Sequence, residues 1–194
     1  MRISGGESRG RQIKAPKHKG LRPTSDKVRE ALFSILAGRT QGARFLELFA
    51  GTGAVGIEAL SRGADRAVFV DGSAKAARLI RENLDALGYR EQAAVVAKDV
   101  IQFLKKIAAE LGPFDIVFVD PPYHEEVGQK TMEALGDEDA GYIGTDAAVV
   151  YEHHKKYPAP DAIGRLIKKK DYVYGDTVVS LYRKGEGIIE KPSS

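Results

Sequence analysis

The sequence predicts an α/β fold in which a mostly parallel sheet is covered by helices on both faces. Between about residues 43 and 119, short apolar runs alternate with amphipathic stretches at helical spacing, which is typical of parallel strands joined by helices. The run 114–119 is apolar apart from Asp115, as expected for a strand buried on both faces. Near the C-terminus, two strand-like runs flank Gly175-Asp176, which is a hairpin signal.

Each element follows from a local pattern. A weakly alternating segment over 1–20 indicates a short hairpin or an extended arm. Capping residues at 24–26 then begin a helix with an apolar stripe, and Gly38 ends it. The expected elements after it are strand 44–49, helix 55–62, strand 66–70, helix 73–87, strand 93–97, helix 100–111, strand 114–119, strand 147–151 and a hairpin of 166–174 with 178–183.

Length and composition narrow the class of protein. The 194 residues fit one domain with a small appendage. Cysteine is absent, which excludes disulfides and thiolate metal sites and fits a reducing compartment. No apolar run approaches the ~20 residues that span a bilayer, and the N-terminus lacks the apolar stretch of a signal peptide. We therefore expect a soluble, cytoplasmic protein.

Positive charge is concentrated near the N-terminus. The net charge is only +3, yet residues 1–44 contain 11 Lys and Arg against 3 acids, a net of +8; the rest of the chain has 19 basic and 24 acidic residues, a net of −5. A basic arm on an acidic body is suited to a polyanion, because its cations lower the cost of approaching phosphates. We expect nucleic-acid contact here; the alternative is a solvated tail.

A glycine-rich turn follows the first predicted strand. Gly51, Gly53 and Gly56 fit the pattern G-x-G-x-x-G between a strand and a helix, which is the context that a nucleotide-binding turn requires. Small residues permit a tight turn and a close approach of the backbone to a ligand. Many nucleotide-binding folds share this pattern, so by itself it predicts only a nucleoside cofactor.

Three acidic residues stand near the ends of successive predicted strands. Glu47 precedes the glycine turn, where a carboxylate would oppose a pyrophosphate but suits the ammonium and sulfonium groups of S-adenosylmethionine. Asp71 is placed to accept both ribose hydroxyls, although nicotinamide cofactors use the same device. Asp99 is placed to receive an adenine amino group. For all three, the alternative is a cap at a strand-to-helix turn.

The most specific motif is Asp120-Pro121-Pro122-Tyr123, directly after the run 114–119. Two prolines fix the loop and remove two backbone donors, which leaves the carbonyl of Pro121 available. With the carboxylate of Asp120 it offers two acceptors, which match the two hydrogens of an exocyclic amine. Tyr123 offers a ring on which a base stacks. The alternative is a rigid turn with a buried, capping Asp120.

The turn and the motif together predict transfer of a methyl group from S-adenosylmethionine to an exocyclic nitrogen of a nucleobase. In this hypothesis the nitrogen attacks the methyl group in line, and catalysis rests on positioning and electrostatics. A base reached in this way must leave its helix or be unpaired already. Asp120 either accepts the departing proton or stabilises the positive charge growing on nitrogen, and both roles stay open.

Two further clusters are given structural interpretations. The pair His153-His154 precedes two lysines and has no further ligands in register, so we interpret it as a basic surface turn and predict no metal site. The three lysines at 168–170 are either a phosphate contact or a solvated edge strand.

The sequence resembles a known family over nearly the whole chain, about residues 2–183, and five segments are the specific parts of this resemblance. They are Arg2-Ile3-Ser4-Gly5-Gly6 with Arg9-Gly10-Arg11, Gly20-Leu21-Arg22-Pro23-Thr24 with Asp26-Lys27-Val28-Arg29-Glu30 and Leu32-Phe33, Leu48-Phe49-Ala50-Gly51-Thr52-Gly53, Glu58-Ala59-Leu60-Ser61-Arg62-Gly63, and Phe118-Val119-Asp120-Pro121-Pro122-Tyr123. The family is that of the bacterial methyltransferases acting on guanine N2 of 16S ribosomal RNA, the RsmD-like group. The basic arm and the Arg-Pro-Thr segment, rather than the amine clamp, separate guanine N2 from adenine N6.

The resemblance implies a class I methyltransferase fold using S-adenosylmethionine: Rossmann-like, with a seven-stranded, mostly parallel sheet and a C-terminal antiparallel hairpin. It implies a guanine in small-subunit rRNA, presented on an assembling 30S particle. It also divides the chain into a basic arm and helix over 1–40 that contacts RNA and covers the cofactor, a methyltransferase domain over 41–184, and a loose tail over 185–194.

The expected site residues fall into three groups. Catalysis is assigned to Asp120, Pro121, Pro122 and Tyr123. Cofactor contacts are assigned to Glu47, Phe49, Gly51, Thr52, Gly53, Asp71, Gly72, Asp99, Val100 and Asp120, and RNA contacts to Arg2, Arg9, Arg11, Lys14, Arg22 and Thr24. Family members often have a larger apolar residue where this chain has Gly72, so adenine packing is expected from Val100 or elsewhere.

Three other functions compete with this interpretation. An adenine-N6 methyltransferase acting on DNA or RNA shares the amine clamp, but a DNA enzyme usually needs a larger target-recognition region than any insert here. A non-catalytic RNA-binding assembly factor would not need intact Asp120, Tyr123 and Gly51-Thr52-Gly53. A nicotinamide-linked oxidoreductase is disfavoured by Glu47.

Overall fold

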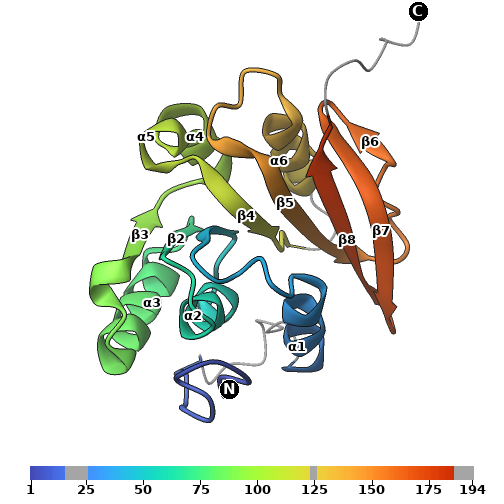
Figure 1. The fold of residues 1–194 in the computed structure, drawn as a ribbon. Coiled ribbons are helices and arrows are strands. Elements are labelled where there is room, and N and C mark those ends of the chain that lie inside the picture. Colours follow the sequence, from blue (N-terminus) through green and yellow to red (C-terminus); the bar gives the residue numbers. More distant parts are fainter. Residues whose placement is uncertain (16–25, 123–125, 186–194) are drawn as a thin grey trace, which may run out of the picture.

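The computed structural model describes residues 1–15, 26–122 and 126–185 (Figure 1). Its elements are α1 Asp26–Ile35, β1 Arg44–Leu48, α2 Ala54–Ser61, β2 Arg66–Asp71, α3 Ala74–Leu87, the 3₁₀ turn η1 Arg90–Gln92, β3 Ala93–Ala97, α4 Val100–Lys106, α5 Ala108–Leu111, β4 Phe114–Val119, α6 Glu126–Gly136, β5 Ile143–His154, β6 Ala162–Ile163, β7 Leu166–Tyr174 and β8 Thr177–Lys184.

The strands form one sheet in the order β3-β2-β1-β4-β5-β8-β7-β6. The pairs from β3 to β5 are parallel, and those from β5 to β6 are antiparallel. This confirms the predicted parallel sheet with an antiparallel hairpin at its C-terminal end. The two-residue β6 adds an eighth strand at the outer edge, beyond the seven that were expected.

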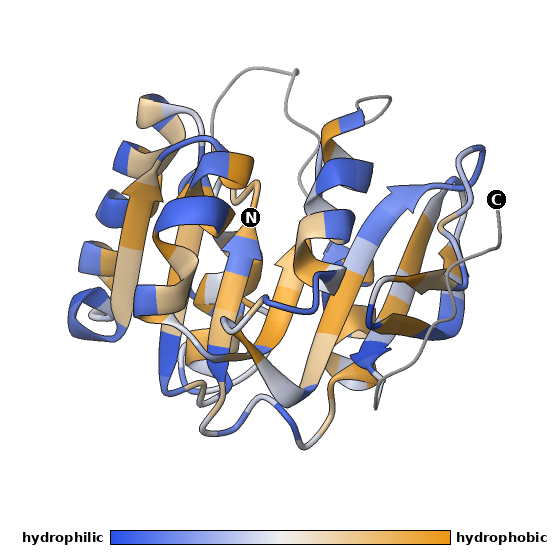
Figure 2. Cartoon of the chain, turned by 90° about the horizontal axis from the view of Figure 1, so that it is seen from above, coloured by the Kyte–Doolittle hydropathy of each residue, from blue (hydrophilic) through white to orange (hydrophobic). Residues whose placement is uncertain are grey.

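Apolar side chains form a core on each face of the sheet. On one face, α1, α2 and α3 contribute residues such as Val28, Ile57 and Ile80. On the other face, Phe103 from α4 and Met132 from α6 pack against the sheet. Seen from above, the strands are largely apolar, whereas the helices carry many hydrophilic segments (Figure 2). Burial on both faces explains the continuous apolar runs in the central strands.

Several element boundaries differ from the prediction. The single helix expected over 100–111 is wrong: it divides at Ile107, whose φ of −128° leaves the helical range. The sequence has no Gly or Pro at this position that would predict the break. The strand expected over 147–151 extends at both ends to 143–154, because backbone pairing with β4 and β8 carries it through polar residues. Helix α6 was not anticipated.

The sheet order brings the predicted site segments to one edge. β1 lies between β2 and β4, and Leu48 is level with both Val70 and Val119. The glycine turn, Asp71 and Asp120 therefore leave neighbouring parallel strands at their carboxyl ends. The connections run in opposite directions from β1, and such a switch point is where open α/β sheets bind ligands. Within the described part of the chain, each helix is too short or too polar to span a membrane.

The N-terminal arm is a short hairpin packed against the body. An isolated antiparallel bridge joins Arg2 and Gln12, and Ile3 and Ile13 are buried in the core beside α1 and α2. The backbone N–H of Ser8 donates to the Ser61 hydroxyl at 3.0 Å. The first 15 residues are thus a docked part of the fold and not a solvated tail.

Candidate active site

The turn after β1 has an unusual backbone. Phe49, Gly51 and Gly53 have φ values of 58°, 53° and 73°. The left-handed region suits glycine but is uncommon for a bulky residue such as phenylalanine. The N–H of Gly53 donates to the Ala50 carbonyl at 2.7 Å, which closes the turn directly before α2. The chain therefore makes the sharp strand-to-helix turn that the glycine pattern predicts.

Glu47 lies beneath this turn and supports it. Its carboxylate accepts hydrogen bonds from the N–H groups of Val55 and Gly56, at 3.3 and 2.8 Å, and its side chain is buried. Burial raises the pKa of Glu47 to about 8, against the two backbone hydrogen bonds, which lower it. Glu47 therefore makes the contacts of a cap at the start of α2, which was the alternative to cofactor binding. Its direct contact with a cofactor stays a prediction.

Asp71 connects the end of β2 to the same turn. Its two carboxylate oxygens accept from the N–H groups of Gly51 and Ser73, both at 2.8 Å. Asp71 is half-buried, and a side chain added at Gly72 would meet no atom within 4 Å. The carboxylate retains acceptor capacity beside open space, so the cradle fits a ribose with two hydroxyls.

The remaining predicted cofactor residues lie in different surroundings. Asp99 is exposed and caps α4, because its carboxylate accepts from the N–H of Gln102 at 3.0 Å. The side chain of Val100 is buried in the core behind the sheet. Thr52 is buried, and its carbonyl accepts from the Asn83 amide at 3.3 Å. An adenine contact by Asp99 or Val100 stays a prediction.

The diproline corner follows β4 at the neighbouring position of the sheet edge. Asp120 is half-buried, Pro121 is buried and Pro122 is exposed, whereas Tyr123 lies outside the described residues. The Tyr151 hydroxyl lies close to this corner, since a Cβ added at Gly128 would lie 2.7 Å from that hydroxyl and 2.8 Å from Pro121. Burial and then Asp120 raise the pKa of Tyr151.

Tyr151 was missed as a site residue. The sequence shows it only as the last apolar residue of the run 147–151, and its position is revealed by pairing, since Tyr151 is level with Val119 of β4. Asp120 follows Val119 at the end of β4, and so Tyr151 lies beside the start of the diproline corner. Periodicity alone contains no signal for such cross-strand neighbours.

The basic residues of the arm remain at the surface. Arg2, Arg9, Arg11 and Lys14 are all exposed. Arg11 donates to the carbonyls of Ala86 and Leu87 at the end of α3, at 2.6 and 3.2 Å, and Lys14 pairs with a glutamate of the same helix. Two further predicted RNA contacts, Arg22 and Thr24, lie outside the described residues.

The interpretation of His153 as part of a basic surface turn is wrong. Its side chain is buried, and its ring stacks on Tyr151 with centroids 5.1 Å apart. Its Nε2 lies 2.8 Å from the hydroxyl of Ser180, which also donates to Asp171 at 2.6 Å. Histidine and the lysines that follow it are polar residues, which suggested a surface turn, but His153 lies in β5 and its side chain is buried there. Among the described residues, no group of three His, Cys, Asp or Glu side chains is arranged for a metal ion.

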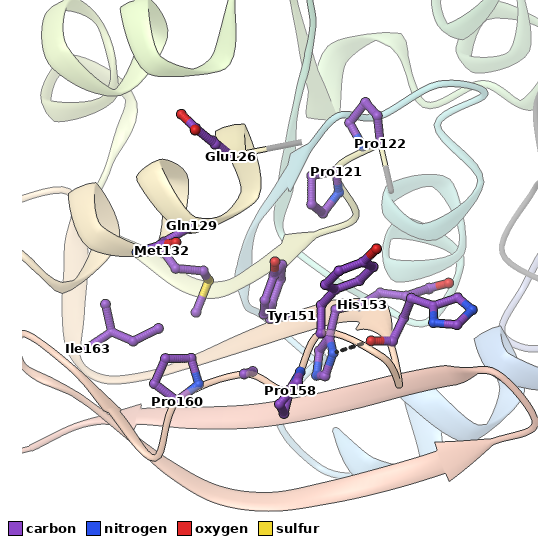
Figure 3. A pocket seen from close by; sticks show the side chains of 14 residues that line it. Pro121, Pro122, Glu126, Gln129, Met132, Tyr151, His153, Pro158, Pro160 and Ile163 are labelled. Carbon is purple, nitrogen blue, oxygen red and sulfur yellow. Dashed lines mark hydrogen bonds between the residues drawn. The ribbon is translucent and has the colours of Figure 1, made fainter. Parts of the chain in front are cut away.

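A cavity that the sequence did not predict lies beside the diproline corner. It has a volume of about 360 Å³ and is bounded by the corner, α6 and the end of β5. The close-up shows Pro121, Pro122, Tyr151 and His153 around it (Figure 3). Its residues come from segments that are far apart in the sequence, which explains why no local pattern announced it.

The architecture defines a Rossmann-like α/β protein in which the glycine turn lies next to the diproline corner. A family model described as Conserved hypothetical protein 95 matches residues 1–183. The chain is 35% identical to the ribosomal RNA small subunit methyltransferase D of Escherichia coli (strain K12), over 95% of this chain and 90% of that protein. The chain therefore belongs to the Conserved hypothetical protein 95 family.

Solved structures agree with this assignment. The E. coli structure described as "Putative methyltransferase yhhF" superposes with a TM-score of 0.84 at 32% identity, covering 95% of this chain and 98% of that one. An RNA methyltransferase from Salinibacter ruber, in complex with S-adenosyl-L-homocysteine, superposes with a TM-score of 0.66 at 16% identity, covering 89% of this chain and all of that one. The second likeness concerns the fold alone. The expected class I methyltransferase fold is thus confirmed.

Proposed function

We propose that this protein transfers a methyl group from S-adenosylmethionine to the exocyclic N2 of a guanine in 16S ribosomal RNA, on an assembling 30S subunit. The coarser activity is methylation of ribosomal RNA with S-adenosylmethionine. The relative from E. coli is named for methylation of ribosomal RNA, and the fold is that of methyltransferases. The proposal adds the guanine nitrogen and the 30S particle. This activity would place the protein in the cytoplasm, together with the ribosome.

The observation that carries the proposal is the pairing of β1 with β4. Because Leu48 is level with Val119, the cofactor turn and the diproline corner begin at adjacent points on the same sheet edge. An amine held at Asp120 would therefore lie next to a cofactor held by the turn. The arrangement joins the two groups of residues that the reaction needs, and catalysis by positioning requires little else.

The chain's own residues would bind and orient the two partners. Asp71 would hold the ribose, and the left-handed turn at Gly51 and Gly53 would let the backbone approach the cofactor. The Pro121 carbonyl and the Asp120 carboxylate would each accept one N–H of the guanine amine. S-adenosylmethionine, when bound, supplies an electrophilic methyl group on a positively charged sulfur. Asp120 then either takes the proton that leaves the nitrogen or stabilises its positive charge.

The docked arm supports RNA as the substrate. Its exposed cations lie on the body of the enzyme, where they add a phosphate-binding surface without the entropy cost of ordering a free tail. Arg22 and Thr24 lie outside the described residues, and we propose that they contact the RNA together with the arm. Residues 1–40 would then act as RNA contact and lid for the catalytic domain over 41–184.

Replacing Asp120 tests the amine clamp. Asp120→Ala removes one of two acceptors for the amine, and we expect turnover of labelled S-adenosylmethionine on 30S particles to fall by at least about a hundredfold, as when one oxyanion donor is removed. Binding of S-adenosylhomocysteine, measured by calorimetry, should stay within about threefold of wild type, since a loss of that size is under 1 kcal/mol. Retained turnover would contradict the clamp.

The isosteric variant tests whether Asp120 acts through more than hydrogen bonding. Asp120→Asn keeps an oxygen acceptor but has neither the negative charge nor the basicity of the carboxylate. Substantial turnover in this variant assigns Asp120 to orientation of the amine, whereas a loss equal to that of Asp120→Ala assigns it to charge stabilisation or proton transfer. Mapping the modified nucleotide on 30S particles, free 16S rRNA and DNA tests the substrate. A methylated adenine would contradict the proposed guanine N2 position.

A further inference from the structure

The cavity beside the diproline corner is built from rings and apolar side chains. Pro121 and Pro122 form one wall, and Met132 of α6 with Ile163 of β6 forms another (Figure 3). Tyr151 and the ring of His153 stacked on it form a third, with an angle of 30° between their planes. Flat apolar walls of this kind suit a planar ligand.

The mouth of the cavity combines an exposed ring with basic residues. Tyr157 lines the cavity, and 53% of it is exposed to solvent, so part of its ring faces solvent at the mouth. The ring of His154 meets it edge-on at 6.3 Å. Lys155 and Lys156, just before Tyr157, are both exposed. Aromatic rings flanked by cations are the pattern by which proteins bind single-stranded nucleic acid.

Acidic side chains decide which part of a nucleotide fits inside. Glu126 and Glu152 line the cavity, and Glu152 is only 4% exposed. Carboxylates repel phosphate groups but accept hydrogen bonds from the N–H groups of bases. The base would therefore enter the cavity, while its phosphates would stay at the mouth near the two lysines.

The lining of the cavity favours a base other than the methylated one. The described lining includes Pro121 and Pro122 but neither Asp120 nor any residue of the glycine turn. A base inside it would contact the two prolines and not the Asp120 carboxylate that is proposed to hold the reacting amine. We propose that the cavity binds an unpaired nucleobase of the RNA strand immediately next to the methylated guanine. The proposed function enters this inference only through the identity of the target base.

A second base site would help to hold the target strand open. Extruding one base costs stacking energy, and stacking its neighbour on Tyr157 and the cavity walls would offset part of that cost. The buried His153 serves as a fixed wall, because its contact with Ser180 orients the ring and burial lowers its pKa, which favours the neutral form. A neutral imidazole can stack on a base without removing a charge from water.

Two variants test the cavity by RNA binding. The probe is a fluorescent single-stranded RNA that contains the methylated guanine and its neighbours. Tyr157→Ala removes the exposed ring, and Gln129→Trp fills the cavity from its α6 rim; each should raise the Kd for this RNA about fivefold to a hundredfold. Val173→Ala and Glu110→Trp, at exposed positions outside the cavity lining, should change it less than about twofold, since they remove no stacking partner.

Crosslinking locates the bound base. Benzoylphenylalanine placed at position 157 and irradiated with 30S particles should crosslink to the nucleotide adjacent to the methylated guanine. The same group at position 173 should not crosslink there. Crosslinks that map elsewhere, or variants that bind the RNA as wild type does, overturn the inference.

The two proposals fail in different ways. If the wild-type protein methylates another base, the proposed function fails, yet crosslinking at position 157 still reports whether a neighbouring base occupies the cavity. If guanine N2 is methylated and position 157 crosslinks to distant nucleotides, the cavity inference fails alone. Calorimetry with S-adenosylhomocysteine should be unchanged in Tyr157→Ala, which separates a strand-binding defect from a damaged active site.

Discussion

At the residue scale, two carboxylates hold a strained turn: Glu47 is buried and Asp71 is half-buried. A non-glycine residue with left-handed φ, such as Phe49, costs about 1–3 kcal/mol and persists only where its surroundings dictate it. Asp71 binds the N–H of Gly51 from one side, and Glu47 binds the N–H of Gly56 from below. The acids that a sequence pattern assigns to ligand binding thus also shape the binding site.

Glu47→Gln tests the protonation of the buried carboxylate. The pKa of Glu47 is raised to about 8 from an ordinary value of 4.5, so the folded state holds a proton that the unfolded state releases. Its contribution to stability is therefore complete below pH 4.5 and is lost as pH rises through about 8. The amide side chain of the variant cannot titrate. We expect wild type to lose stability relative to the variant as pH rises.

Urea unfolding of both proteins at several pH values measures this effect. The free energy of unfolding of wild type minus that of Glu47→Gln should fall steadily between pH 4.5 and about 8, the interval that the raised pKa defines. His153, whose pKa is lowered chiefly by burial, titrates in both proteins and cancels from the difference. A difference that is constant over this interval would show that the carboxylate ionises normally.

At the scale of elements, the sequence predicts the strands and helices that have a clear hydrophobic periodicity and are bounded by turn residues. The strands at 93–97 and 114–119 begin and end where expected, because turns and glycines bound their apolar runs. Helix α6 was missed, since its buried face contains Gly128, Thr131 and Gly136 beside the apolar Met132 and Leu135. The break at Ile107 has no local signal either. Tertiary packing decides such features, and local preference does not.

The candidate site was predictable to the same extent. The glycine turn and the diproline corner are local motifs, and their approach follows from the order of parallel strands. Tyr151, the burial of His153 and the cavity depend on cross-strand register and on α6, which no local pattern contains. The glycine turn and the diproline corner were therefore visible in the sequence, whereas the walls beyond the corner were not.

Gly56 shows how closely α2 must approach β2. A Cβ added there would lie 2.4 Å from the Phe69 ring and 2.8 Å from the Glu47 carboxylate. Both neighbours are buried, so Gly56→Ala should lower the free energy of unfolding by about 1–3 kcal/mol, the usual cost of overpacking. The measurement is chemical denaturation.

Gly72→Ala is the matched control for this substitution. Nothing lies within 4 Å of a Cβ at Gly72, and its φ is not positive. We expect no loss of stability, and a small gain of about 0.4–1 kcal/mol is the usual result where alanine fits. No loss of stability in Gly56→Ala would mean that α2 and β2 have room to separate, and equal destabilisation of both variants would assign the loss to the backbone and not to the close approach.

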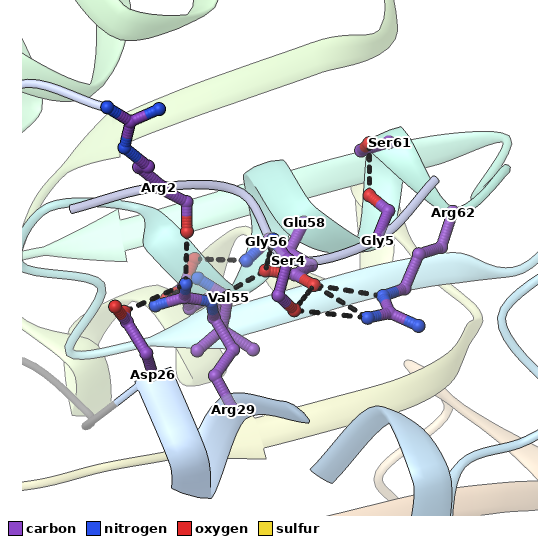
Figure 4. Close-up of polar contacts among 11 residues, drawn as sticks. Arg2, Ser4, Gly5, Asp26, Arg29, Val55, Gly56, Glu58, Ser61 and Arg62 are labelled. Atoms are coloured by element: carbon purple, nitrogen blue, oxygen red, sulfur yellow. Dashed lines mark hydrogen bonds and ion pairs between the residues drawn. The ribbon is translucent and has the colours of Figure 1, made fainter. Parts of the chain in front are cut away.

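At the scale of the whole molecule, one buried carboxylate joins three segments of the chain. Glu58 of α2 binds Arg29 of α1 at 2.6 Å, Arg62 at 2.8 Å and the N–H of Ser4 in the arm at 3.1 Å (Figure 4). Arg29 also donates to the carbonyl of Arg2. The N-terminal arm is thereby connected to the helix that begins at the glycine turn.

Glu58→Gln should both destabilise the protein and release the arm. Arg29 is completely buried and would keep, among the described residues, only the exposed Asp26 as a charged partner, so the loss of Glu58 should cost up to about 3–5 kcal/mol, the range for a broken buried pair. We expect a decrease of that size in the free energy of unfolding, with faster amide exchange at Ser4. Glu82→Gln, which breaks the exposed pair with Lys14, should cost less than about 1 kcal/mol.

The pH dependence of this effect distinguishes the loss of a charge interaction from the loss of packing. Burial by itself raises the pKa of Glu58, but hydrogen bonds from Ser4, Arg29 and Arg62 outweigh it and lower the pKa below 4.5. The stabilisation is therefore present above pH 4.5 and is lost as pH falls through the folded pKa. The difference between wild type and Glu58→Gln should narrow in acid. A difference that persists unchanged there would assign the loss to packing, and the arm would then be held by its apolar contacts at Ile3 and Ile13 and not by Glu58.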